Sequence, residues 1–188
     1  IDHYEPSVPT HLPKEIPFYV QPQDGDAIRN DGFTNVIPIE EIKTIDGISI
    51  YRTTGHHGFG QIGQMMGPVS GYVLKAEGFP TVYIMGDCRW EACIRDTVER
   101  FNPDYIVVNS GGAIFPEFSK TDGPIIPDEN EVMQILDELP SHIKLIAVHM
   151  DAIDHCQTTR AILRNEATHH EADMSRLIIP EDGETVVL

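Results

Sequence analysis

Long hydrophobic runs are missing from this sequence. No stretch approaches the roughly 20 consecutive apolar residues that a helix needs to cross a bilayer, so we expect no membrane partner. Cysteine is also scarce, because the chain has only Cys88, Cys93 and Cys156. A small, odd number of cysteines argues against a disulfide framework and favours a reducing, cytoplasmic location.

Positive charge is in short supply as well. The chain has 13 Lys and Arg residues against 30 Asp and Glu, which gives a formal net charge of −17 and a pI near 4.7. Such a field repels phosphate backbones, so nucleic acid is a poor partner and a nuclease is disfavoured. An excess of carboxylates suits a protein that holds cations, although solubility alone also explains it.

Two common catalytic motifs are absent. The glycine-rich stretch 53–67, TTGHHGFGQIGQMMG, lacks the spacing and the Lys-Ser/Thr pair of a phosphate-binding loop. Ser70 and Ser110 lack the nucleophile-elbow motif and a placed base. Nucleotide binding through a phosphate loop and serine-hydrolase chemistry are therefore both disfavoured.

Residues 81–113 form the stretch around which the chain is organised. The apolar run 81–85 predicts a buried strand, which Gly86 ends. Apolar residues at three- and four-residue steps over 89–101 predict an amphipathic helix, and 105–109 a second buried strand. Asp87 therefore lies at the C-terminal edge of a strand, where ligands gather in α/β folds. The alternative for Asp87 is a helix or turn cap.

The rest of the chain predicts elements of both kinds. Asp46-Gly47, between apolar alternations, predicts a hairpin of strands 42–45 and 48–52. We expect further strands at 16–20, 35–38, 69–76, 143–148 and 176–179, helices at 22–30, 128–139 and 158–167, and loops at 4–15, 53–67 and 110–127. Hairpins followed by strand–helix alternation predict an α/β layered fold, and 188 residues suit one domain spanning 1–188.

Histidines follow several of these predicted strand ends and glycine turns. His56 and His57 are adjacent, and on an extended backbone their side chains point opposite ways, so only one can face a given site. His57 is a candidate ligand or a polar turn residue. His149 ends the predicted strand 143–148 and is a second candidate. Together with Asp87, these residues have the composition of a site for zinc or a similar divalent ion.

Other residues near these positions have more than one interpretation. Asp2-His3 is by itself a frayed surface pair. His155, six residues after His149, is a helix-start residue, a substrate contact or a support for a ligand. Cys88 directly follows the candidate carboxylate, but a small buried thiol is the better interpretation.

Together, these segments resemble the metallo-β-lactamase-fold hydrolases, in the branch that includes L-ascorbate-6-phosphate lactonase-like proteins. The resemblance runs over essentially the whole chain. It is carried by the order and spacing of Asp2-His3, TTGHHGFGQIGQMMGPVSGYVL, VYIMGDC, NPDYIVVNSGGA, GPIIPDENEV, IAVHMDAIDHC and IPEDGE. It implies a four-layer αβ/βα sandwich made of two similar halves.

The resemblance also implies a set of metal ligands. The family's first motif reads His-x-His-x-Asp-His, and Asp2 and His3 match its last two residues. His57 matches the ligand of the glycine loop, Asp87 the bridging carboxylate and His149 the last histidine. Asp2, His3, Asp87 and His149 would hold one ion. His57, Asp87 and the first two histidines of the motif would hold the other. Those two histidines and the strands before them are not in this sequence, so we expect the N-terminal part of the family domain to be absent.

The activity implied is hydrolysis by a metal-activated water, acting on a small ester, lactone or phosphoester. Asp2 is the candidate to orient that water or accept its proton, and His155 the candidate substrate contact or proton shuttle. Two divalent ions are expected, zinc by preference, with manganese or iron as alternatives. The competing hypothesis is a non-catalytic metal-binding or scaffold fragment of the same fold. We expect a small-molecule partner, and a homo-oligomer stays open.

Overall fold

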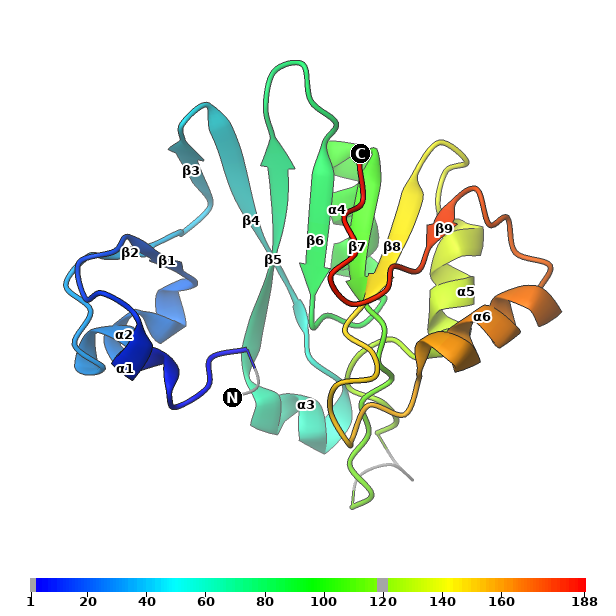
Figure 1. Ribbon diagram of the computed structural model, residues 1–188, viewed down its shortest axis with the longest axis horizontal. Helices are drawn as coiled ribbons and strands as arrows, with labels where there is room; N and C mark the ends of the chain where they lie inside the picture. Colours follow the sequence, from blue (N-terminus) through cyan, green and yellow to red (C-terminus); the bar gives the residue numbers. More distant parts are fainter. Residues whose placement is uncertain (1–2, 118–121) are drawn as a thin grey trace. The chain divides into compact units, whose positions relative to one another are not determined.

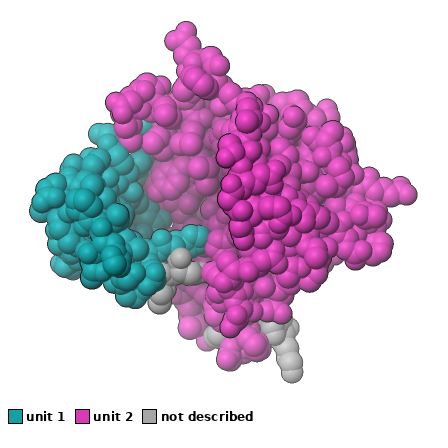
Figure 2. Space-filling view, viewed as in Figure 1, with its two compact units in different colours: residues 1–43 teal, residues 44–188 magenta. Residues whose placement is uncertain are grey.

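The structure, a computed structural model, describes residues 3–117 and 122–188. The chain divides into two compact units, residues 1–43 and residues 44–188, which Figure 2 distinguishes by colour. Among the described residues, no helix has the length and apolar character needed to span a bilayer.

The first unit is built around a small aromatic core. It contains α1 (Val8–His11), β1 (Phe18–Val20), the 3-10 helix η1 (Pro22–Asp24), α2 (Gly25–Asn30) and β2 (Val36–Pro38). β1 and β2 pair in parallel. Phe33 is buried and its ring lies 4.8 Å from that of Phe18, with the Lys14 ammonium 4.3 Å from the Phe33 centroid. The short helix α1 lies inside the proline-rich segment that was expected to be a loop.

A seven-stranded mixed sheet forms the second unit (Figure 1). Its strand order follows the sequence: β3 (Ile42–Ile45), β4 (Ile48–His56), β5 (Pro68–Lys75), β6 (Val82–Gly86), β7 (Tyr105–Asn109), β8 (Lys144–Val148) and β9 (Leu177–Ile178). β3 begins just before the division between the units. β5 is antiparallel to both β4 and β6, whereas β6 to β9 run parallel to one another. Asp46 and Gly47 both have positive φ, as the predicted hairpin turn requires.

In the described part of this unit, the sheet is accompanied by the helices α3 (Gly60–Met66), α4 (Ala92–Phe101), α5 (Glu129–Glu138) and α6 (Arg160–His169). α5 and α6 begin at side-chain caps, because Asp128 accepts from the Glu131 amide and Thr159 accepts from the Ile162 amide. The parallel strands contribute fully buried side chains to one core with α4 and α5, among them Tyr83, Met85, Ile94, Ile106, Val108, Val132, Ile135 and Leu145. The predicted α/β class is therefore confirmed.

Two further local predictions were wrong. Residues 53–67 are not one loop, because β4 continues to His56, where it pairs with Pro68 of β5, and α3 then begins at Gly60. Glycines suggested a loop, but Gly63 instead lets α3 approach the Gly58 carbonyl closely. Helix α4 begins at Ala92 rather than at residue 89, because the backbone amide of Trp90 donates to a carboxylate on α5.

Several strands end at a common edge of the sheet. β6, β7 and β8 are parallel, with Gly86 in register with Val108 and Asn109 with Val148. β4 runs in the same direction as β6 because both are antiparallel to β5. The residues that directly follow β4, β6 and β8 are therefore presented at the same edge (Figure 1).

Candidate metal centre

Asp87 is positioned by the sharp end of β6. Gly86 has φ +68°, and a Cβ there would lie 2.9 Å from the Ser70 carbonyl oxygen, so a side chain is excluded. Asp87 itself is 9% exposed. Its Oδ1 accepts a hydrogen bond from Asn109 Nδ2 at 2.6 Å. This bond fixes one carboxylate oxygen, since Asn109 is also buried and ends the neighbouring strand β7.

His57 faces Asp87 from the end of β4. Its Nε2 lies 3.8 Å from Asp87 Oδ2, the oxygen opposite the Asn109 contact. The preceding His56 is turned toward Glu91, whose two carboxylate oxygens lie 2.8 and 2.9 Å from His56 Nδ1. The two adjacent imidazoles therefore diverge, as expected for neighbours on an extended backbone, and His57 is the one beside the carboxylate.

His149 reaches the same place from the end of β8. A ligand atom of His149 and one of Asp87 lie within 4.8 Å of each other. Cys156 Sγ lies 3.9 Å from His149 Nδ1. Behind it, the Val148 carbonyl accepts from both the amide and the hydroxyl of Ser110, at 2.9 and 3.1 Å, which holds the end of β8 against β7.

The segment that carries His149 has an unusual backbone. His149 has φ +65° and Asp151 φ +62°, the left-handed region that favours glycine. For residues with a side chain this conformation costs roughly 1–2 kcal/mol each. Such strain persists only where the surroundings enforce it, and it is concentrated at functional sites. The backbone here therefore places the imidazole at the cost of local stability.

The remaining sequence candidates are Asp2, His3 and His155. Asp2 lies outside the described residues. His3 belongs to the unit formed by residues 1–43 and is exposed. His155 is half-buried, with its ring stacked on Phe115 at 5.2 Å between centroids and 21° between planes. The roles expected of all three stay predictions.

Sequence reasoning missed the groups that hold Asp87 and the residues after it, Arg89 and Trp90. Asn109 ends a strand parallel to β6, so its place at the shared edge was a usable signal. Glu131, on α5, accepts from Arg89 Nε at 2.6 Å and from the Trp90 amide at 2.7 Å. Burial raises the pKa of Glu131, while the Arg89 guanidinium opposes that rise. The local sequence around Arg89 and Trp90 does not indicate a partner as distant along the chain as Glu131.

Cys88, next to Asp87, is a structural residue. Its side chain is fully buried, and burial raises the pKa of the thiol. A Cβ at Gly55 would collide with Cys88 Sγ, so the thiol occupies the space that is open because Gly55 of β4 has no side chain. This agrees with the interpretation of Cys88 as a small buried hydrophobe rather than a thiolate ligand.

The donor set suits a divalent cation. Asp87 places a carboxylate in a largely buried position with a neutral amide on one oxygen. An ionised carboxylate there is costly without a nearby positive charge. Imidazoles from His57 and His149 and a carboxylate oxygen are ligands that zinc, manganese and iron accept. The residues present therefore fit a metal ion at this edge of the sheet.

Comparisons with known proteins bear on the family and the fold. No family model matches the chain. The UPF0173 protein YddR of Bacillus subtilis is 31% identical over 188 residues, which is 98% of this chain and 71% of YddR. The chain therefore belongs to the UPF0173 family.

Solved structures give the fold. A possible metal-dependent hydrolase from Veillonella parvula matches with a TM-score of 0.91 and 31% identity. An isothiocyanate hydrolase from Delia radicum gut bacteria matches with a TM-score of 0.90 and 32% identity. Each match covers all of this chain and 72% of the other.

The metallo-β-lactamase fold protein YhfI of Bacillus subtilis is more distant. It matches with a TM-score of 0.58 and 14% identity, over 88% of this chain and 62% of YhfI, and bears on the fold alone. The chain has the metallo-β-lactamase fold, as the resemblance implied. The names of the nearer structures support an enzyme of hydrolase type.

Proposed function

We propose that this protein is a metal-dependent hydrolase that acts on a small ester, lactone or phosphoester, like the L-ascorbate-6-phosphate lactonase-like branch of its fold. The observation that carries the proposal is the convergence on Asp87. His57 approaches its Oδ2 at 3.8 Å, and a ligand atom of His149 lies within 4.8 Å of one of its oxygens. Three strand ends thus bring three donors of the type that metals use to one place.

His57, Asp87 and His149 would hold the metal, and Asp2 and His3 would add ligands from the N-terminal segment. The imidazoles favour zinc, and manganese or iron suit the carboxylates. Two ions are proposed, and Asp87 would be a ligand to both. When bound, such ions lower the pKa of a water molecule and stabilise the negative charge that develops in the reaction.

The chain's own groups have separate tasks around that centre. Asn109 holds Asp87 Oδ1 at 2.6 Å and so directs Oδ2 toward His57. Asp2 is proposed to orient the attacking water and to accept its proton. His155, stacked on Phe115, is proposed to contact the substrate or return a proton to the leaving group. A charge of −17 disfavours polyanionic substrates such as RNA.

A second candidate substrate class is the isothiocyanates. It is suggested by the isothiocyanate hydrolase that is 32% identical over the whole of this chain. The central carbon of an isothiocyanate is an electrophile, as are a lactone carbonyl and a phosphoester phosphorus. The same donor set therefore suits either class, and substrate contacts would decide between them.

Metal analysis combined with a substrate panel tests the proposal. The protein would be stripped with chelator, reloaded with zinc, manganese or iron, and assayed on lactones, carboxylic esters, phosphodiesters and isothiocyanates. Asp87→Ala is the test variant. Asp137→Ala is the matched control, because Asp137 also faces a histidine, His170 at 2.8 Å, but on an exposed helix surface.

Stoichiometric metal in the wild type, with turnover that Asp87→Ala abolishes and Asp137→Ala leaves unchanged, is the expected result. Metal binding without turnover on any class would favour the non-catalytic scaffold. Retention of both metal and turnover by Asp87→Ala would refute the proposed centre. A salt-dependent affinity for RNA would instead revive a nuclease.

A further inference from the structure

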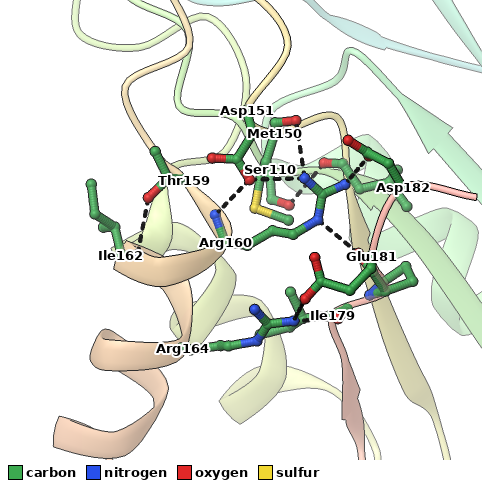
Figure 3. A network of polar contacts seen from close by, with 12 residues as sticks. Ser110, Met150, Asp151, Thr159, Arg160, Ile162, Arg164, Ile179, Glu181 and Asp182 are labelled. Atoms are coloured by element: carbon green, nitrogen blue, oxygen red, sulfur yellow. Dashed lines mark hydrogen bonds and ion pairs between the residues drawn. The ribbon is translucent and has the colours of Figure 1, made fainter. Parts of the chain in front are cut away.

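A network centred on Arg160 adjoins the segment that carries His149. Arg160 is the first residue of α6, and its side chain is 12% exposed. Its Nη1 donates to Asp151 Oδ2 at 2.8 Å and to the Met150 carbonyl at 3.5 Å (Figure 3). The Arg160 backbone amide also donates to Asp151 Oδ2, at 3.1 Å. One arginine thus binds both residues that follow His149.

The same guanidinium reaches the chain beyond β9. Its Nε donates to the Pro180 carbonyl at 2.7 Å, and its Nη2 pairs with the Asp182 carboxylate (Figure 3). Residues 179–182, here called the tail segment, are therefore joined through Arg160 to residues 149–151. These two parts of the chain are distant in sequence, and the arginine is bound from both sides.

Arg160 binds one of the two residues with a strained backbone, Asp151, and also Met150, which lies between Asp151 and His149. His149 and Asp151 both have positive φ, and the Asp151 carboxylate and the Met150 carbonyl bind the guanidinium. The left-handed conformation is disfavoured at residues that carry side chains, and the bonds from Arg160 to Met150 and Asp151 help to hold this segment in it. The direction of the His149 imidazole depends on that conformation, because His149 is itself one of the two residues.

We propose that Arg160 is a positioning residue for His149, with the tail segment as its second anchor. The inference rests on the proposed metal centre and adds to it a determinant of metal affinity that is not itself a ligand. Groups that orient a metal ligand commonly contribute 10- to 100-fold to metal affinity. A purely structural arginine would change the stability of the fold without changing the ligand geometry.

Arg164 provides a matched control one turn further along α6. Its Nη2 donates to the Ile179 carbonyl at 3.0 Å and pairs with Glu181 at 2.6 Å, so it binds the same tail segment. Arg160→Ala and Arg164→Ala each remove one guanidinium that links α6 to the tail segment. Of the two arginines, Arg160 is the one with hydrogen bonds to Met150 and Asp151.

The experiment measures metal binding directly. Zinc dissociation constants would be obtained for the stripped proteins by competition with a chromogenic chelator. The visible absorption spectrum of the cobalt-loaded proteins reports ligand geometry, and thermal unfolding without metal reports stability. We expect Arg160→Ala to weaken zinc binding by about tenfold or more and to alter the cobalt spectrum. Arg164→Ala should lower the unfolding temperature while leaving both metal readouts unchanged.

A milder pair covers the case in which Arg160→Ala does not fold. Asp182→Ala removes an anchor of Arg160 and Glu181→Ala an anchor of Arg164, and both carboxylates are largely exposed. Weaker zinc binding in Asp182→Ala but not in Glu181→Ala supports the proposal. If the two variants of either pair changed zinc binding equally, or if neither changed it, the proposal about Arg160 would be overturned without contradicting the metal centre. A wild-type protein that binds no metal would remove both proposals.

Discussion

Replacing Asn109 by leucine tests the orientation of Asp87. Leucine has the same number and branching of side-chain heavy atoms as asparagine but donates no hydrogen bond, so the change removes the 2.6 Å bond to Asp87 Oδ1. The Asp87 carboxylate is then released to rotate about its side-chain bonds. We expect the variant to fold and to bind metal more weakly.

The size of the effect follows from the contact. A hydrogen bond to a charged group contributes about 1.5–3 kcal/mol, and 1.4 kcal/mol corresponds to a tenfold change in affinity. If the bond acts mainly by holding Asp87 ready for the metal, zinc binding should weaken by about 10- to 100-fold. If it acts mainly on the fold, the loss should appear in the free energy of unfolding instead.

Chelator competition on Asn109→Leu, beside urea unfolding of the metal-free protein, separates these outcomes. Thr97→Val is the control, because Thr97 is similarly buried, at 8% exposure, and its hydroxyl donates to the Cys93 carbonyl at 2.9 Å within α4. A zinc dissociation constant in Asn109→Leu equal to that of Thr97→Val would refute the orienting role.

Three further outcomes are expected. Hydrogen bonds, first of all from Arg95, lower the pKa of Glu138 to about 2, so its contribution to stability is present above pH ~4.5 and is lost as the pH falls toward 2. Urea unfolding across that range should therefore depend less on pH in Glu138→Gln, by a modest amount because the side chain is 36% exposed. Gly111→Ala would place a Cβ against the His149 carbonyl, and both the unfolding temperature and the zinc affinity should fall. Glu131→Ala removes the carboxylate that accepts from the half-buried Arg89 guanidinium and from the Trp90 amide, and chemical denaturation should show a loss of about 1.5–3 kcal/mol.

Much of the fold was predictable because local patterns and tertiary structure agree. The Asp46-Gly47 turn and the buried runs of β6, β7 and β8 have the composition that the structure needs. The start of α4 was not predictable, since it depends on a bond from the Trp90 amide to Glu131 on another helix. α3 was missed because its glycines serve close packing rather than a flexible loop.

The candidate site was likewise only partly predictable from the sequence. The meeting of Asp87, His57 and His149 at one edge of the sheet was predictable, because polar residues at the ends of parallel strands share a location. Of the groups that hold them, Asn109 had a usable signal at the end of the predicted strand 105–109, whereas Arg160 resembles an ordinary polar surface residue in the sequence. Their importance comes from contacts across strands and from a positive φ at His149, which a single sequence does not display.

The register of the parallel strands has a consequence for assembly. Asp87 and His149 follow β6 and β8, which are not neighbours but are joined through β7. A slip of one residue in either pairing would turn a donor to the opposite side of the sheet. A bound cation would then stabilise only the correctly aligned sheet, because Asp87 and His149 meet only in that register. Refolding with metal present should yield fewer misaligned molecules than refolding in chelator, provided that the cation dissociates from them more readily than from the native form.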